Sequence, residues 1–64
     1  MKELKAGDVV IAPNGCESYL TAGKEYLVIE ATKEIIEIFD DEGDVLYLCL
    51  KGSAHLNGGN WIVK

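Results

Sequence analysis

The chain has few of the residues from which metal centres and catalytic sites are built. Its 64 residues include no arginine, a single histidine, His55, and two cysteines, Cys16 and Cys49. A structural zinc ion usually takes four Cys or His ligands arranged as close pairs. A Cys–His nucleophile needs a positioned base and an oxyanion site as well. We therefore expect no metal, no cofactor and no enzymatic activity.

The chain also lacks segments that would direct it to a membrane or out of the cell. Residues 1–5 are too short and too charged to be a signal peptide. No apolar run approaches the roughly 20 residues of a membrane span. These absences favour the cytoplasm, where thiols stay reduced, so no disulfide between Cys16 and Cys49 is expected. A chain of this length holds one domain with a small core, which we place over residues 1–64.

Positive charge is scarce and dispersed. Six lysines stand against eleven carboxylates, which gives a formal charge of −5, and no two lysines form a basic run. Such a field repels phosphate backbones and anionic membranes, so nucleic-acid and membrane binding are disfavoured. The acidity favours solubility. An alternative is a small acidic inhibitor that imitates nucleic acid, using Asp40, Asp41, Glu42 and Asp44.

One β-hairpin signal dominates the middle of the chain. Two runs rich in β-branched and aromatic residues, 35–39 and 45–50, are separated by the five turn-type residues 40–44. Gly43 is expected to supply a positive φ at the tip. The acidic tip lacks the twelve-residue ligand spacing of an EF-hand, so we interpret it as a solvated turn rather than a calcium site.

Three further segments have strand character. The run 25–31 carries apolar residues on both parities, so it is either covered on both faces or bent by a bulge to serve two sheets. A helix over residues 25–37 is the alternative, but the β-branched residues there and the lack of an N-cap favour strands. The predicted strands are residues 9–12, 25–31, 35–39, 45–50 and 61–63. A loop covers residues 13–24, and a second loop over 51–60 contains one helical turn at 53–56.

Five short strands with this loop pattern predict an all-β fold, a small five-stranded SH3-like barrel with a helical turn before the last strand. The order of signals resembles a group of small SH3-like barrel proteins encoded in bacteriophages and prophages. The likeness is carried by residues 7–10, 20–28, 40–44 and 61–63. The loop over 51–60 is longer than in that group. Members mostly lack an assigned activity, so the resemblance implies an architecture rather than a function.

Aromatic residues supply the candidates for a binding site. Peptide-binding SH3 domains line a groove with aromatic side chains and select basic ligands with acidic ones. The candidate protein-binding residues are Glu17, Tyr19, Tyr47, Leu48 and Trp61. The alternative is that Tyr26, Phe39 and Trp61 fill the core or its rim. A cage for methylated lysine is a related alternative.

The run 45–50 is apolar without alternation, although a small barrel has only one interior. One parity must therefore face outward, either Val45, Tyr47 and Cys49 or Leu46, Leu48 and Leu50. An exposed apolar stripe commonly marks a partner surface or a homodimer contact. The sequence thus predicts a non-enzymatic protein-interaction module of phage or prophage origin, able to form a weak homodimer. A nucleic-acid-associated barrel is the alternative that the charge disfavours.

Overall fold

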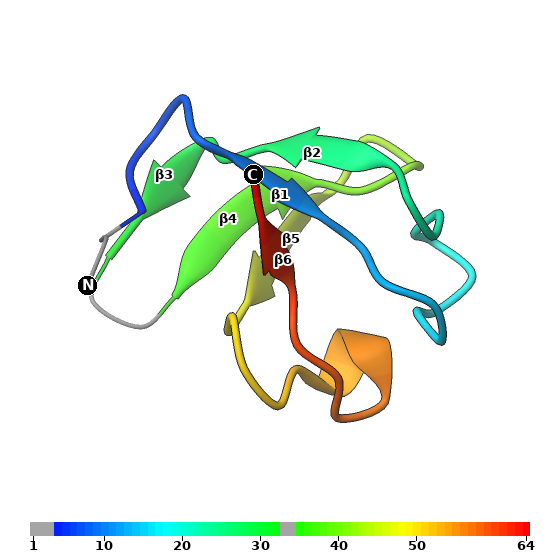
Figure 1. Cartoon of the computed structure of the whole chain (residues 1–64). Helices are drawn as coiled ribbons and strands as arrows, with labels where there is room; N and C mark the ends of the chain where they lie inside the picture. Colours follow the sequence, from blue (N-terminus) through cyan, green and yellow to red (C-terminus); the bar gives the residue numbers. More distant parts are fainter. Residues whose placement is uncertain (1–3, 33–34) are drawn as a thin grey trace.

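Six short β-strands form two three-stranded antiparallel sheets in the computed structural model, which describes residues 4–32 and 35–64 (Figure 1). The first sheet has the order β2–β1–β6, with β1 in the centre. Its strands are β1 (Val9–Ile11), β2 (Glu25–Leu27) and β6 (Ile62–Val63). Pairing of β1 with β6 joins two segments that lie far apart in the sequence.

The second sheet has the order β3–β4–β5 and contains the predicted hairpin. Its strands are β3 (Glu30–Ala31), β4 (Ile36–Phe39) and β5 (Val45–Leu48). The last residue of β4 pairs with the first of β5 across the acidic turn. Gly43 in that turn has a φ of +83°, so the hairpin and its positive φ are both confirmed.

The predicted strand over residues 25–31 divides into β2 and β3, which belong to different sheets. Glu30 is the register partner of Glu37, yet the amide of Ile29 also donates to the Glu37 carbonyl at 2.8 Å. Ile29 and Glu30 thus both lie opposite Glu37, and this is the pattern of a β-bulge, which bends the strand. The bend explains the apolar residues of both parities in this run, and the alternative helix over 25–37 is wrong.

The expected closed, five-stranded barrel needs correction. The described residues form six strands, because one predicted strand divides, and they pair only within the two separate sheets. Two backbone bonds connect the chain after β5 with the chain leading into β6: the Trp61 amide donates to the Leu50 carbonyl at 2.8 Å, and the Ser53 amide donates to the Gly59 carbonyl at 2.9 Å. The outer edge of β5 meets the 3₁₀ helix η1 (Ala54–Leu56), which lies within the predicted helical turn.

The core lies between the inner faces of the two sheets and extends to η1. Its buried apolar residues are Val10, Ala12, Leu20, Tyr26, Val28, Ile36, Ile38, Leu48, Leu56 and Trp61. The rings of Tyr26 and Trp61 meet edge to face with centroids 5.9 Å apart. Their expected place in the core is confirmed. Phe39 is different, because it lies on the outward parity of β4 and is 53% exposed.

Candidate interaction surface

The outward side of the second sheet carries a row of exposed apolar side chains. In β5 the even positions face the core, where Leu48 is buried, and the odd positions face outward, where Tyr47 is 61% exposed. Phe39 and Val45 are register partners, so their side chains are neighbours across the two strands. We call this surface the β4–β5 face. Its apolar residues are Ile35, Phe39, Val45, Tyr47 and Cys49.

The parity of the run 45–50 is thereby resolved in favour of Val45, Tyr47 and Cys49. A signal for the same conclusion exists in the preceding strand, where Glu37 shares a parity with Phe39. A carboxylate is costly to bury without a partner, so its parity is the one that faces water. The sequence interpretation did not use that signal and offered the core or its rim as the place of Phe39.

A shallow depression of about 290 Å³ continues the β4–β5 face toward η1. Ile35, Tyr47 and Cys49 belong to both the face and the depression. The remaining lining residues are Leu48, Gly52, Ser53, Ala54 and His55. Because the depression lies at one end of an apolar surface, a side chain of a docked partner would find both a flat apolar contact and a recess.

Two carboxylates flank the apolar row. Glu37 lies opposite Tyr47 on one side and opposite Glu30 on the other. Glu37 is half-buried and Glu30 is exposed. Like charges in directly opposed positions of neighbouring strands are destabilising. The β4–β5 face therefore combines exposed aromatic and aliphatic groups with a concentrated negative charge.

His55 joins Tyr19 to the edge of β5. Its Nε2 lies 2.9 Å from the Tyr47 backbone carbonyl oxygen, and its Nδ1 lies 2.7 Å from the Tyr19 hydroxyl. A carbonyl can only accept, so Nε2 carries the hydrogen, and in the neutral ring Nδ1 accepts from the hydroxyl. Burial raises the pKa of Tyr19, and the charges of Glu17 and Asp40 add to this. The hydroxyl is therefore protonated at neutral pH and able to donate.

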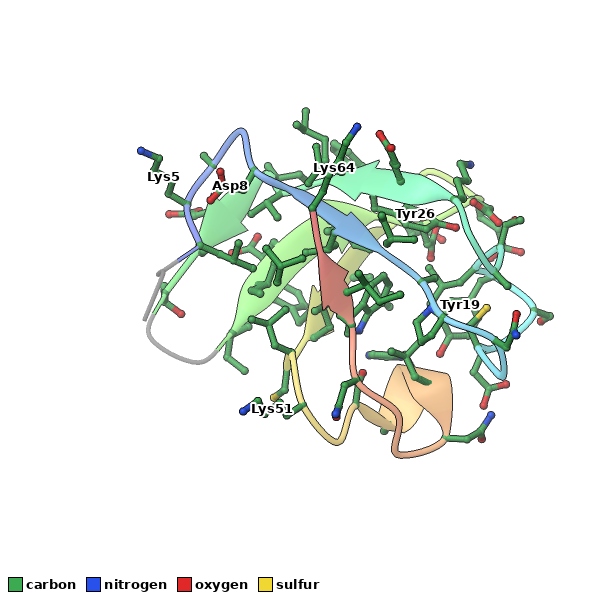
Figure 2. All side chains as sticks on the ribbon, in the orientation of Figure 1. Lys5, Asp8, Tyr19, Tyr26, Lys51 and Lys64 are labelled. Atoms are coloured by element: carbon green, nitrogen blue, oxygen red, sulfur yellow. The ribbon has the colours of Figure 1, made fainter. Side chains whose placement is uncertain are left out.

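The predicted binding residues separate into two groups. Glu17, Tyr19 and Tyr47 surround His55, since the Glu17 amide donates to the His55 carbonyl at 3.1 Å and the Tyr19 ring meets the imidazole edge to face. Figure 2 shows Tyr19 in the 13–24 loop, beside η1, where its hydroxyl lies near His55. Leu48 and Trp61 are instead core residues, only 2% and 5% exposed, so their side chains are not on the surface.

Asp41 is the centre of a polar network that the sequence interpretation missed. Its carboxylate accepts hydrogen bonds from Lys24 Nζ at 2.7 Å, from Thr21 Oγ1 at 2.6 Å and from the Tyr26 hydroxyl at 2.9 Å. The Lys24 hydrogen bond, with those from Thr21 and Tyr26, lowers the pKa of Asp41 to about 2. The network ties the acidic turn to the 13–24 loop, so Asp41 serves the fold rather than a surface.

The other acidic residues of the turn lie close together. Oxygen atoms of Asp40, Glu42 and Asp44 lie within 4.8 Å of one another. Oδ1 of Asp40 already accepts the backbone amides of Glu42 and Asp44, at 2.9 and 3.0 Å. These bonds are those of a turn stabilised by its own aspartate, so the cluster is explained by the local fold.

Cys16 and Cys49 are both free thiols, the first half-buried and the second exposed. Comparison of the chain with protein-family models, curated proteins and solved structures gives no match. Within residues 4–32 and 35–64, no helix has the length and apolar character required to cross a membrane.

Proposed function

We propose that this chain is a non-enzymatic protein-interaction module that binds a partner protein through the β4–β5 face. The supporting observation is the continuous row of exposed apolar side chains on β4, β5 and the residues beside them. Contiguous apolar patches on small proteins commonly mark interaction sites. Aromatic groups such as Tyr47 and Phe39 are the residues that contribute most at protein interfaces.

We further propose an SH3-like architecture, open beside β5, and an origin in a phage or prophage whose host cytoplasm is the site of action. Support comes from the run 25–31, which bends so that β2 and β3 join different sheets, and from the short helix before β6. The segments 7–10 and 61–63, which carry the resemblance, also lie side by side through the pairing of β1 with β6. The two free thiols suit a reducing compartment.

The charges favour a protein partner over nucleic acid. Among the described lysines, Lys24 pairs with Asp41 and Lys64 pairs with Glu25, so part of the scarce positive charge is already engaged within the molecule. We also propose that self-association through the β4–β5 face is weak at most. Two copies with a formal charge of −5 repel each other, and this face brings its own carboxylates to the contact.

The proposal is tested by matched substitutions on the two sheets. Tyr47 and Leu27 are each 61% exposed, but Leu27 lies on β2 in the first sheet. Tagged wild-type protein, Tyr47→Glu and Leu27→Glu are compared for capture of proteins from host lysate, after thermal melts establish that each is folded. We expect at least one lysate protein to be captured by wild type and by Leu27→Glu but not by Tyr47→Glu. Equal capture by all three would contradict the proposal.

A further inference from the structure

We infer that the partner segment carries lysine or arginine beside an apolar side chain, and that Glu30 and Glu37 select it. The inference rests on the proposed function, which supplies the face, and adds the chemistry of its occupant. It depends on three features: the opposed carboxylates, the apolar row beside them, and the recess at the end of that row.

The carboxylates form a site for a cation because of their register. Glu30 and Glu37 are cross-strand partners on β3 and β4, with both side chains on the outward side. In such pairs the Cβ atoms are about 5 Å apart. A lysine or arginine placed between the two carboxylates replaces their mutual repulsion with attraction to both. Since Glu37 is half-buried, that attraction is less screened by water than at a fully exposed site.

The apolar anchor of the same partner would lie on the opposite side of Glu37. Tyr47 stands directly across from Glu37 on β5, and it lines the recess together with Ile35 and Cys49. One strand spacing, about 4.8 Å, separates the backbone of Glu37 from that of Tyr47. A basic residue and an apolar residue on one short segment can therefore reach both positions together.

Charge complementarity decides between the occupants of this face. A second copy would place Glu30 and Glu37 of one chain close to carboxylates of another, and a nucleic acid would bring phosphates to them. A basic and apolar peptide segment meets both the negative charge and the exposed apolar groups. The face therefore fits a cationic amphipathic segment of a protein partner.

The test uses a short labelled peptide, capped at both ends, in which one phenylalanine is flanked by lysines. A matched peptide has glutamine in place of each lysine. Binding is measured by fluorescence anisotropy to wild type, Glu30→Gln, Glu37→Gln and Glu42→Gln. The last variant is the control, because it changes the net charge equally but lies at the exposed hairpin tip. Tyr47→Glu tests the face itself.

We expect the lysine peptide to bind more tightly than the glutamine peptide, and its affinity to fall as salt is added. Glu30→Gln and Glu37→Gln should each weaken binding by about fivefold, while Glu42→Gln stays within about twofold of wild type. Tyr47→Glu should remove measurable binding.

Several results would overturn the inference, and they separate it from the proposed function. If Tyr47→Glu loses the lysate partner but the glutamine variants at 30 and 37 bind like Glu42→Gln, the face is functional and its selection of cations is wrong. If Tyr47→Glu changes neither readout, both proposals are wrong. A third result is that wild type binds no peptide and sediments as a dimer, more so at higher salt, while Tyr47→Glu sediments as a monomer. That result would identify a second copy of the chain as the occupant of the face.

Discussion

At the scale of single residues, Asp41 shows how one carboxylate can hold two turns together. The pKa of Asp41 is about 2, below the ordinary aspartate value of 3.8, and the hydrogen bond from Lys24 is the largest cause of this shift. A carboxyl group whose pKa is lower in the folded state stabilises the fold fully above its unfolded pKa. That contribution is lost as the pH falls from about 4 toward 2.

The expected result is a pH-dependent difference between wild type and Asp41→Asn. In urea unfolding, wild type should be more stable than the variant at neutral pH, and the difference should shrink as the pH falls through this window. Glu42→Gln is the control at the same turn. A difference between wild type and Asp41→Asn that is constant from neutral pH to pH 2 would show that ionisation of Asp41 is not involved.

Gly43 gives a second test at this scale. Its φ of +83° is unfavourable for a β-branched residue, whereas the space around its Cβ position is open. Gly43→Val should therefore destabilise the fold by about 1–2 kcal/mol through backbone strain alone. Gly43→Asn should cost less, because asparagine tolerates this region better. Equal melting temperatures for wild type and Gly43→Val would argue against the hairpin geometry.

The hydroxyl of Tyr19 provides a third test at the scale of single residues. Tyr19→Phe leaves Nδ1 of His55 without its hydrogen-bond donor and should cost about 1 kcal/mol in chemical unfolding. Tyr47→Phe is the matched control, since His55 binds the backbone carbonyl of residue 47, which that substitution retains. A similar loss of stability in both variants would mean that the hydroxyl of Tyr19 contributes nothing specific.

At the scale of secondary-structure elements, the sequence located nearly every strand but not how the strands divide. Runs of β-branched and aromatic residues, bounded by turn residues, placed the hairpin and the first and last strands, and the loop before the last strand was expected to hold the helical turn. The division between β2 and β3 depends on the bulge at Ile29, which is set by packing of one chain segment against two sheets. Local propensity does not encode that choice, so the run 25–31 indicated either a strand covered on both faces or a bulge, without deciding between them.

The same limitation applies to the candidate surface. Two of the five predicted binding residues, Leu48 and Trp61, are in the core, while Glu30 and Glu37 were not considered. Whether an aromatic residue fills the interior or faces water depends on its strand's register with a distant segment. Asp41 could not be distinguished from its acidic neighbours, because its partner Thr21 is 20 residues away.

The alternation in β4 can be tested directly. Ile38 is fully buried, whereas its neighbour Phe39 is 53% exposed. Ile38→Ala should cost about 2–5 kcal/mol by leaving a cavity, and Phe39→Ser should change the stability by no more than about 0.5 kcal/mol. Denaturant unfolding of the two variants distinguishes them. A larger loss for Phe39→Ser would mean that the strand has the opposite face inward.

At the scale of the whole molecule, the fold should depend on no added ion. Asp40 uses its carboxylate to accept the amides of Glu42 and Asp44, which leaves the acidic turn ordered by the chain itself. Melting temperatures should therefore be the same with EDTA and with millimolar calcium. A ligand that binds only the folded state raises its stability, so a higher melting temperature in calcium would show that the turn holds the ion.

The bond between His55 and the Tyr47 carbonyl also bears on aggregation. An apolar strand with a free edge is a template on which further chains add in register, one after another. At the middle of β5 that edge is engaged by the imidazole. Protonation does not release it, because Nε2 donates in both charge states of the ring. A further strand could therefore pair with the Tyr47 carbonyl only by displacing the imidazole, which opposes strand addition at this point of β5.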